Sequence, residues 1–233
     1  MKKVQISVKK IARYEDLIAC KPKCETARKV MDLNGLISKI GSVIVAATVF
    51  LFALCMIVGY PFGSYLVCMF LPIGYIMMAA GFQYECSDER RVAANIGLLF
   101  SAIYTVLILL VYFAQTTSVR QEDLTEQAIR LLDYQRGGLL FNYDLLGYGM
   151  MALSTFFVGL SMQARSIADR WLKSLLMIHG VFFLGCFVMP MTGVFTSMAD
   201  GESGKGGTIA LLIWCVYFFP IGVLAYKHFK KIT

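Results

Sequence analysis

Six long, uninterrupted apolar runs constrain this chain more than any other feature of its sequence. The clearest is residues 41–60, which contain no charged side chain. A helix rises about 1.5 Å per residue, so about 20 apolar residues span the roughly 30 Å hydrocarbon core of a bilayer. The runs are continuous, whereas a membrane β-barrel needs alternating segments of about ten residues. They predict six membrane-spanning helices, near residues 38–59, 62–82, 93–115, 144–163, 172–192 and 208–226.

The composition of the chain also fits a protein that is surrounded by the hydrocarbon core of a membrane. The chain is 58% hydrophobic and only 16% charged, whereas a soluble domain carries about 45–50% apolar and about 25% charged residues. A soluble protein this poor in charge could not cover its surface with polar groups. We therefore predict an all-α, polytopic transmembrane helix bundle. Residues 37–233 form the six-helix membrane domain, and residues 1–36 form a basic cytoplasmic N-terminal arm.

The distribution of basic residues predicts the orientation. With the N-terminus in the cytoplasm, 18 of the 22 Lys and Arg residues fall on the inner side and four on the outer side. Loops rich in Lys and Arg stay in the cytoplasm, so both termini are expected there. The expected location is a cell membrane, of the bacterial cytoplasmic type. The same bias accounts for the net charge of +7 without a nucleic-acid partner.

The basic arm has apolar residues at roughly helical spacing, at Ile11, Tyr14, Leu17 and Ile18. One interpretation is a short surface helix, held by the lipid bilayer and by anionic lipid headgroups. The other is an orientation signal followed by an unstructured tail. We favour the surface helix, and the pattern implies no specific protein partner.

The longest connection outside the membrane, residues 116–143, predicts an amphipathic surface helix near 119–136. Ser118 and Gln121 have the spacing of a capping box, and Gly137 and Gly138 supply a stop. This helix is either a lid over an outward-facing cavity or a connector that places its apolar face in the membrane interface. The connector is the simpler interpretation.

Motifs for catalysis and metal binding are weak. Residues 201–208 look like a phosphate-binding loop, but Ala199 and Gly206 stand where that motif needs Gly and Ser or Thr. Of the seven cysteines, only Cys20 and Cys24 form a short-spaced pair, and no His lies near it. None is predicted in an outer loop, so we expect no disulfide. We also expect no metal site and no cofactor.

The candidate ligand-binding residues are His179, Asn95, Tyr104 and Asp144. An ionisable group at membrane depth usually faces the bundle interior, and His179 lies midway along the predicted fifth helix. Asn95 and Tyr104 are polar positions on the third helix. Asp144 lies at the outer mouth of the fourth, where it could bind a cation. The simpler interpretations are a structural interhelical hydrogen bond for His179 and an interfacial helix cap for Asp144.

These observations leave three functional hypotheses. The first is a non-enzymatic membrane protein that binds or transports a small or lipidic ligand. The alternative is a regulatory or partner subunit of a membrane complex. The third is an intramembrane lipid-modifying enzyme, which would need an acid–base pair or a metal at one depth. We prefer the first, because the sequence offers no such pair.

Overall fold

A computed structural model describes residues 33–195 and 205–232 of the chain. The described part consists of helices joined by turns and loops, with no β-strand. Six of its helical segments are long and apolar enough to cross a membrane, which confirms the predicted all-α bundle with six spans. The expected surface helix of the basic arm lies outside the described residues.

The six spans follow the predicted order along the chain. The first is the helix Leu33–Val58, which ends at a turn where Gly59 has a φ of 72°. The second joins α2 and α3, the third is α4, the fourth is α6, the fifth joins α7 and α8, and the sixth is α9. The bounds are Pro61–Cys68 (α2), Phe70–Glu85 (α3), Arg91–Thr116 (α4), Leu139–Ser161 (α6), Ile167–His179 (α7), Phe182–Val188 (α8) and Lys205–Ile232 (α9).

Two boundaries differ from the predicted ones in ways that concern the site. The fourth span begins at Leu139, so Asp144 lies inside the helix and not at its mouth. The fifth span begins at Ile167 and is interrupted after His179. At this break the chain packs closely on α6: a Cβ atom on Gly180 would lie 2.8 Å from the Cβ of Phe156.

The outer connection is helical over a shorter stretch than the predicted 119–136. The physical reason lies in its caps. Ser118 begins only a single 3-10 turn, and the hydroxyl of Thr125 is the group that caps a helix, by accepting a hydrogen bond from the Ala128 N–H at 3.3 Å. Asp133 then leaves the helical conformation. The connection therefore consists of η2 (Ser118–Arg120), α5 (Glu126–Leu132) and η3 (Tyr134–Arg136).

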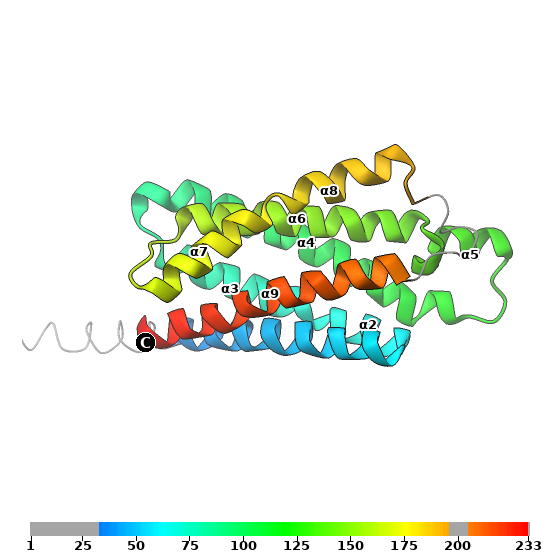
Figure 1. The fold of residues 1–233 in the computed structure, drawn as a ribbon, viewed down its shortest axis with the longest axis horizontal. Helices are drawn as coiled ribbons and strands as arrows, with labels where there is room; N and C mark the ends of the chain where they lie inside the picture. The colour runs from blue at the N-terminus through cyan, green and yellow to red at the C-terminus, as the bar shows by residue number, and fades with distance from the viewer. Residues whose placement is uncertain (1–32, 196–204, 233) are drawn as a thin grey trace, which may run out of the picture.

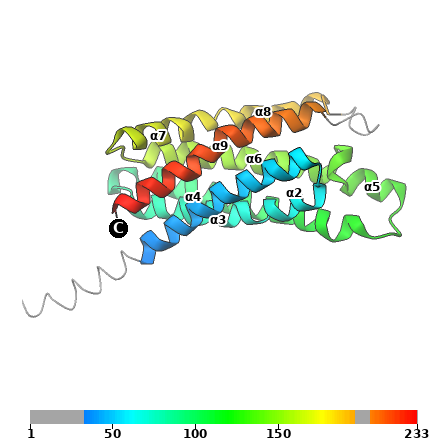
Figure 2. The ribbon, with the colours of Figure 1, turned by 60° about the horizontal axis from the view of Figure 1, so that its bottom comes forward.

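The spans run side by side along the long axis of the molecule (Figures 1 and 2). The Leu33–Val58 helix lies against α9, where the rings of Phe50 and Phe219 are 6.4 Å apart. An extensive contact joins α4 and α6. The C-terminus lies at the end where the first span begins, and α5 lies at the opposite end (Figure 1). All predicted cytoplasmic turns therefore share one end of the bundle, and the inside–outside orientation stays a prediction.

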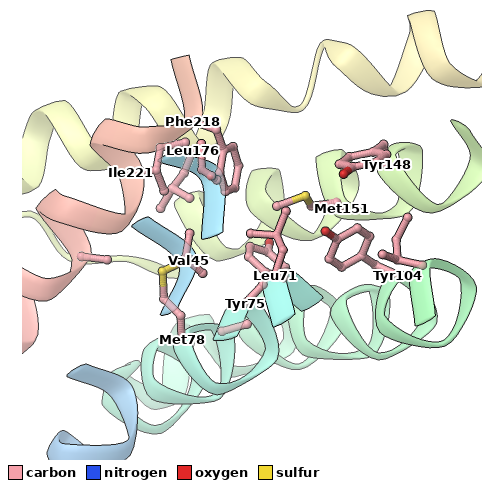
Figure 3. Packing of buried hydrophobic residues seen from close by; sticks show 14 of the residues in the cluster. Val45, Leu71, Tyr75, Met78, Tyr104, Tyr148, Met151, Leu176, Phe218 and Ile221 are labelled. Atoms are coloured by element: carbon pink, nitrogen blue, oxygen red, sulfur yellow. The ribbon is translucent and has the colours of Figure 1, made fainter. Parts of the chain in front are cut away.

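Small residues and buried aromatic rings hold the bundle together. A Cβ atom on Gly97 of α4 would lie 2.9 Å from Cγ2 of Val158, so only glycine permits this approach of α4 to α6. Ser154 of α6 donates to the Gly97 carbonyl at 2.6 Å and accepts from the Tyr75 hydroxyl at 2.9 Å. Tyr75 belongs to the core shown in Figure 3. Gly97 and Ser154 thus join α4 and α6 at close approach.

Candidate functional site

A buried carboxylate, Asp144, is the centre of the strongest candidate site. The residue is only 1% exposed. The hydroxyl of Tyr134 donates to its Oδ2 atom at 3.2 Å, and the hydroxyl of Tyr112 also approaches the carboxyl group. Oδ1 has no hydrogen-bond partner. An unpaired buried carboxylate oxygen is energetically unfavourable, and an ionisable group inside a membrane bundle is a functional candidate.

Two further tyrosines near this carboxylate have unsatisfied hydroxyls. Tyr148 lies one turn after Asp144 on α6, and its ring is 5.8 Å from that of Tyr104 on α4, beside Met151 (Figure 3). Neither buried hydroxyl makes a hydrogen bond of good geometry, although the two hydroxyls approach each other. Buried polar groups in folded proteins are nearly always paired, so three oxygens without a well-formed hydrogen bond in one region require an explanation. We refer to Asp144, Tyr104, Tyr112, Tyr134 and Tyr148 as the Asp144 cluster.

The outer connection covers this cluster, and Gln115 holds it in place. The Gln115 amide group donates to the carbonyl of Leu132 at 2.7 Å and accepts from the N–H of Tyr134 at 3.1 Å. These two bonds fix η3 above Asp144. Burial, and then the neighbouring Asp144 carboxylate, hold the pKa of the Tyr134 hydroxyl well above its usual range. The hydroxyl therefore stays protonated and donates to Asp144.

The arrangement has the chemistry of a site for a small cation. A carboxylate supplies the negative charge, and its free Oδ1 can accept a hydrogen bond or coordinate an ion. The surrounding tyrosine rings offer electron-rich faces, which attract organic cations. The hydroxyls of Tyr104 and Tyr148 supply neutral oxygen atoms. A cation would satisfy all of these groups, whereas an anion would be repelled by Asp144.

His179 lies in a separate environment, in which all of its polar atoms are paired. The Nε1–H of Trp214 donates to Nε2 of His179 at 3.0 Å, so Nε2 carries no proton. Nδ1 is 2.9 Å from the hydroxyl of Thr155, which donates in turn to the Ala152 carbonyl at 2.8 Å. The ring is 1% exposed and stacks on Phe182 at 5.1 Å. These contacts are those of a structural histidine joining α6, α7 and α9.

The structure brings some of the four candidate residues together and separates the others. Tyr104 and Asp144 share the Asp144 cluster. His179 connects to it only indirectly, because Trp214 packs edge-on against Tyr148 at 5.3 Å. Asn95 is exposed near the start of α4 and accepts a hydrogen bond from Gln83 at 3.0 Å. It lies in neither the Asp144 cluster nor the contacts of His179.

A second polar cluster, which sequence reasoning missed, lies at the opposite end of the bundle. His228 of α9 has Nδ1 3.0 Å from Oδ1 of Asp169 and Nε2 3.1 Å from Oε2 of Glu85. The three residues, which we call the inner triad, connect α3, α7 and α9. A small pocket beside it is lined by Cys86 and Arg165, among others. Within the described residues, no three His, Cys, Asp or Glu side chains are grouped so as to hold a metal ion.

Comparison of the chain with protein-family models, with curated proteins and with solved structures finds no match. The six apolar helices fit a multi-pass membrane protein. What this membrane protein does therefore has to be inferred from its own residues.

Proposed function

We propose that the chain is a non-enzymatic membrane protein that binds a small organic cation at the Asp144 cluster. The observation that carries the proposal is the unpaired Oδ1 of a carboxylate that is 1% exposed. A protonated amine is the ligand that fits this cluster best, because its N–H groups pair with a carboxylate while its charge faces aromatic rings. A bare metal ion would use the oxygen atoms but not the rings.

The outer connection acts as the cover of this site. Tyr134 contributes both a hydroxyl that binds Asp144 and a ring that packs on Phe141 at 5.2 Å. Few contacts hold α5 and η3, and Gln115 supplies two of the hydrogen bonds. In this proposal, ligand entry breaks the Tyr134–Asp144 hydrogen bond, and the ligand's own N–H group replaces it. The predicted orientation places this entrance on the outer side.

The proposal is tested by ligand-induced thermal stabilisation of the purified full-length protein in lipid nanodiscs. Methylammonium and tetramethylammonium chloride are compared with sodium chloride at equal ionic strength. A ligand at 100 times its Kd stabilises the folded state by about 3 kcal/mol. We expect an ammonium ion to raise the unfolding temperature of the wild type and to leave that of Asp144→Asn unchanged.

Asp123→Asn provides the matched control, because Asp123 is an exposed carboxylate in the same outer connection. It should respond to ammonium ions as the wild type does. Equal responses of Asp144→Asn and the wild type would disprove binding at Asp144. If no cation stabilises the wild type, the alternative of a regulatory or partner subunit becomes the better hypothesis.

A further inference from the structure

Two cationic side chains from distant parts of the chain converge on a single carbonyl oxygen. Nη1 of Arg90, at the end of the 3-10 turn η1 (Asp88–Arg90), donates to the carbonyl of Met162 at 3.0 Å. Nζ of Lys173, on α7, donates to the same oxygen at 3.0 Å. The two cationic groups therefore lie within two hydrogen-bond lengths of each other.

The carbonyl oxygen of Met162 cannot neutralise the charges of Arg90 and Lys173. Met162 caps the C-terminus of α6, and a helix C-terminus carries only about half of one negative elementary charge. Two full positive charges face it. The pair therefore keeps a net positive charge at the end of the bundle.

Two neighbouring carboxylates, Asp88 and Asp169, are engaged elsewhere. Asp88 pairs with Arg91, the residue that follows Arg90. Asp169 lies one turn before Lys173, but its oxygens face His228 and the backbone N–H of Arg165. Among the described residues, no carboxylate forms a salt bridge with Arg90 or Lys173.

An exposed tryptophan beside this pair is typical of the level of lipid headgroups. Trp171 lies two residues before Lys173 and is 65% exposed, and tryptophan is enriched where the bilayer meets water. Both cationic side chains are partly buried, so their charged ends are held in position. Positively charged pockets between helices at this depth bind phosphate-bearing headgroups.

We propose that Arg90 and Lys173 form a binding site for the phosphate group of an anionic phospholipid. The guanidinium group offers a planar pair of N–H donors to phosphate oxygens, and the ammonium group adds a point charge. The Met162 carbonyl holds the two groups together before the lipid arrives. The lipid phosphate supplies the negative charge that the protein lacks here.

The test is a native mass spectrometry titration of the full-length protein with phosphatidylglycerol, with phosphatidylcholine as the zwitterionic reference. We expect the wild type to bind phosphatidylglycerol about tenfold more tightly than phosphatidylcholine. The Arg90→Gln/Lys173→Gln variant should lose this preference. The control variant Arg91→Gln/Arg170→Gln removes the same amount of charge from two exposed neighbours. It should keep the preference for phosphatidylglycerol.

Two further arms separate the lipid site from its alternatives. Arg90→Lys keeps the charge and should keep most of the preference, so its complete loss in a folded Arg90→Lys variant would overturn a charge-based site. Inorganic phosphate should bind weakly and should not displace phosphatidylglycerol. Full displacement by inorganic phosphate would overturn the lipid as the ligand, and an unchanged preference in the double Gln variant would overturn the site itself.

Discussion

Replacing His228 tests whether the inner triad holds three spans together. Both of its ring nitrogens face carboxylate oxygens, of Asp169 at 3.0 Å and of Glu85 at 3.1 Å. An ionised carboxylate only accepts hydrogen bonds, so both nitrogens must donate and the ring is an imidazolium ion. His228→Leu removes this charge and leaves two carboxylates without a cation between them.

The exposure of the three side chains determines the expected magnitude. The side chains of His228 and Asp169 are 6% and 4% exposed, whereas that of Glu85 is 20% exposed. Removing one partner of a buried ion pair costs about 3–5 kcal/mol, whereas an ordinary interhelical hydrogen bond in a membrane protein contributes about 0.6 kcal/mol. We expect His228→Leu to lower the free energy of unfolding by about 3 kcal/mol. Asp169→Asn should lower the free energy of unfolding more than Glu85→Gln does, because water screens the more exposed pair of His228 and Glu85.

Reversible unfolding in mixed detergent micelles measures these free energies. Lys227→Leu is the matched control, because it removes an exposed cation from the adjacent position of α9 and should change stability by less than about 0.5 kcal/mol. A double-mutant cycle of His228→Leu with Asp169→Asn then isolates the energy of the pair. A loss of about 0.6 kcal/mol or less in His228→Leu would refute the ion-pair reasoning.

Two other predictions test the packing and the orientation. Gly97→Ala should lower the free energy of unfolding by about 1–3 kcal/mol, because the new Cβ atom meets Val158. Gly207→Ala is the control, because a Cβ atom there has no neighbour within 4 Å, and it should be neutral or slightly stabilising in the same unfolding assay. In a background without native cysteines, a membrane-impermeant maleimide added to intact cells should label Thr125→Cys and not Arg170→Cys. The reverse labelling pattern would invert the predicted topology.

The number and order of the spans were predictable from the sequence because a hydrocarbon solvent imposes them. A span must be apolar for about 20 residues and must satisfy its backbone internally, and this requirement is local. The interruption after His179 was not predictable in the same way. At this interruption Gly180 packs closely on Phe156 of another span, and such a contact exists only in the folded bundle.

The candidate sites were predictable only in part, for the same reason. Asp144 stands out as a carboxylate next to an apolar run, but its partner Tyr134 reaches it because Gln115 anchors the outer connection. The inner triad has no local signature. His228 is separated from Glu85 by 143 residues, and in the sequence it stands among basic residues near the C-terminus.

The contrast between paired and unpaired polar atoms separates a structural role from a functional one. His179→Leu leaves the Trp214 N–H without its acceptor, so it should lower the free energy of unfolding by about 1–3 kcal/mol. Asp144→Asn replaces a buried carboxyl group whose Oδ1 has no hydrogen-bond partner, so it should stabilise the ligand-free protein by about 1 kcal/mol while it abolishes stabilisation by ammonium ions. The unfolding assay in detergent micelles, with and without methylammonium, measures both effects. A loss of stability in Asp144→Asn as large as that in His179→Leu would show that the carboxylate serves the fold, because a group kept for ligand binding is unfavourable until the ligand arrives.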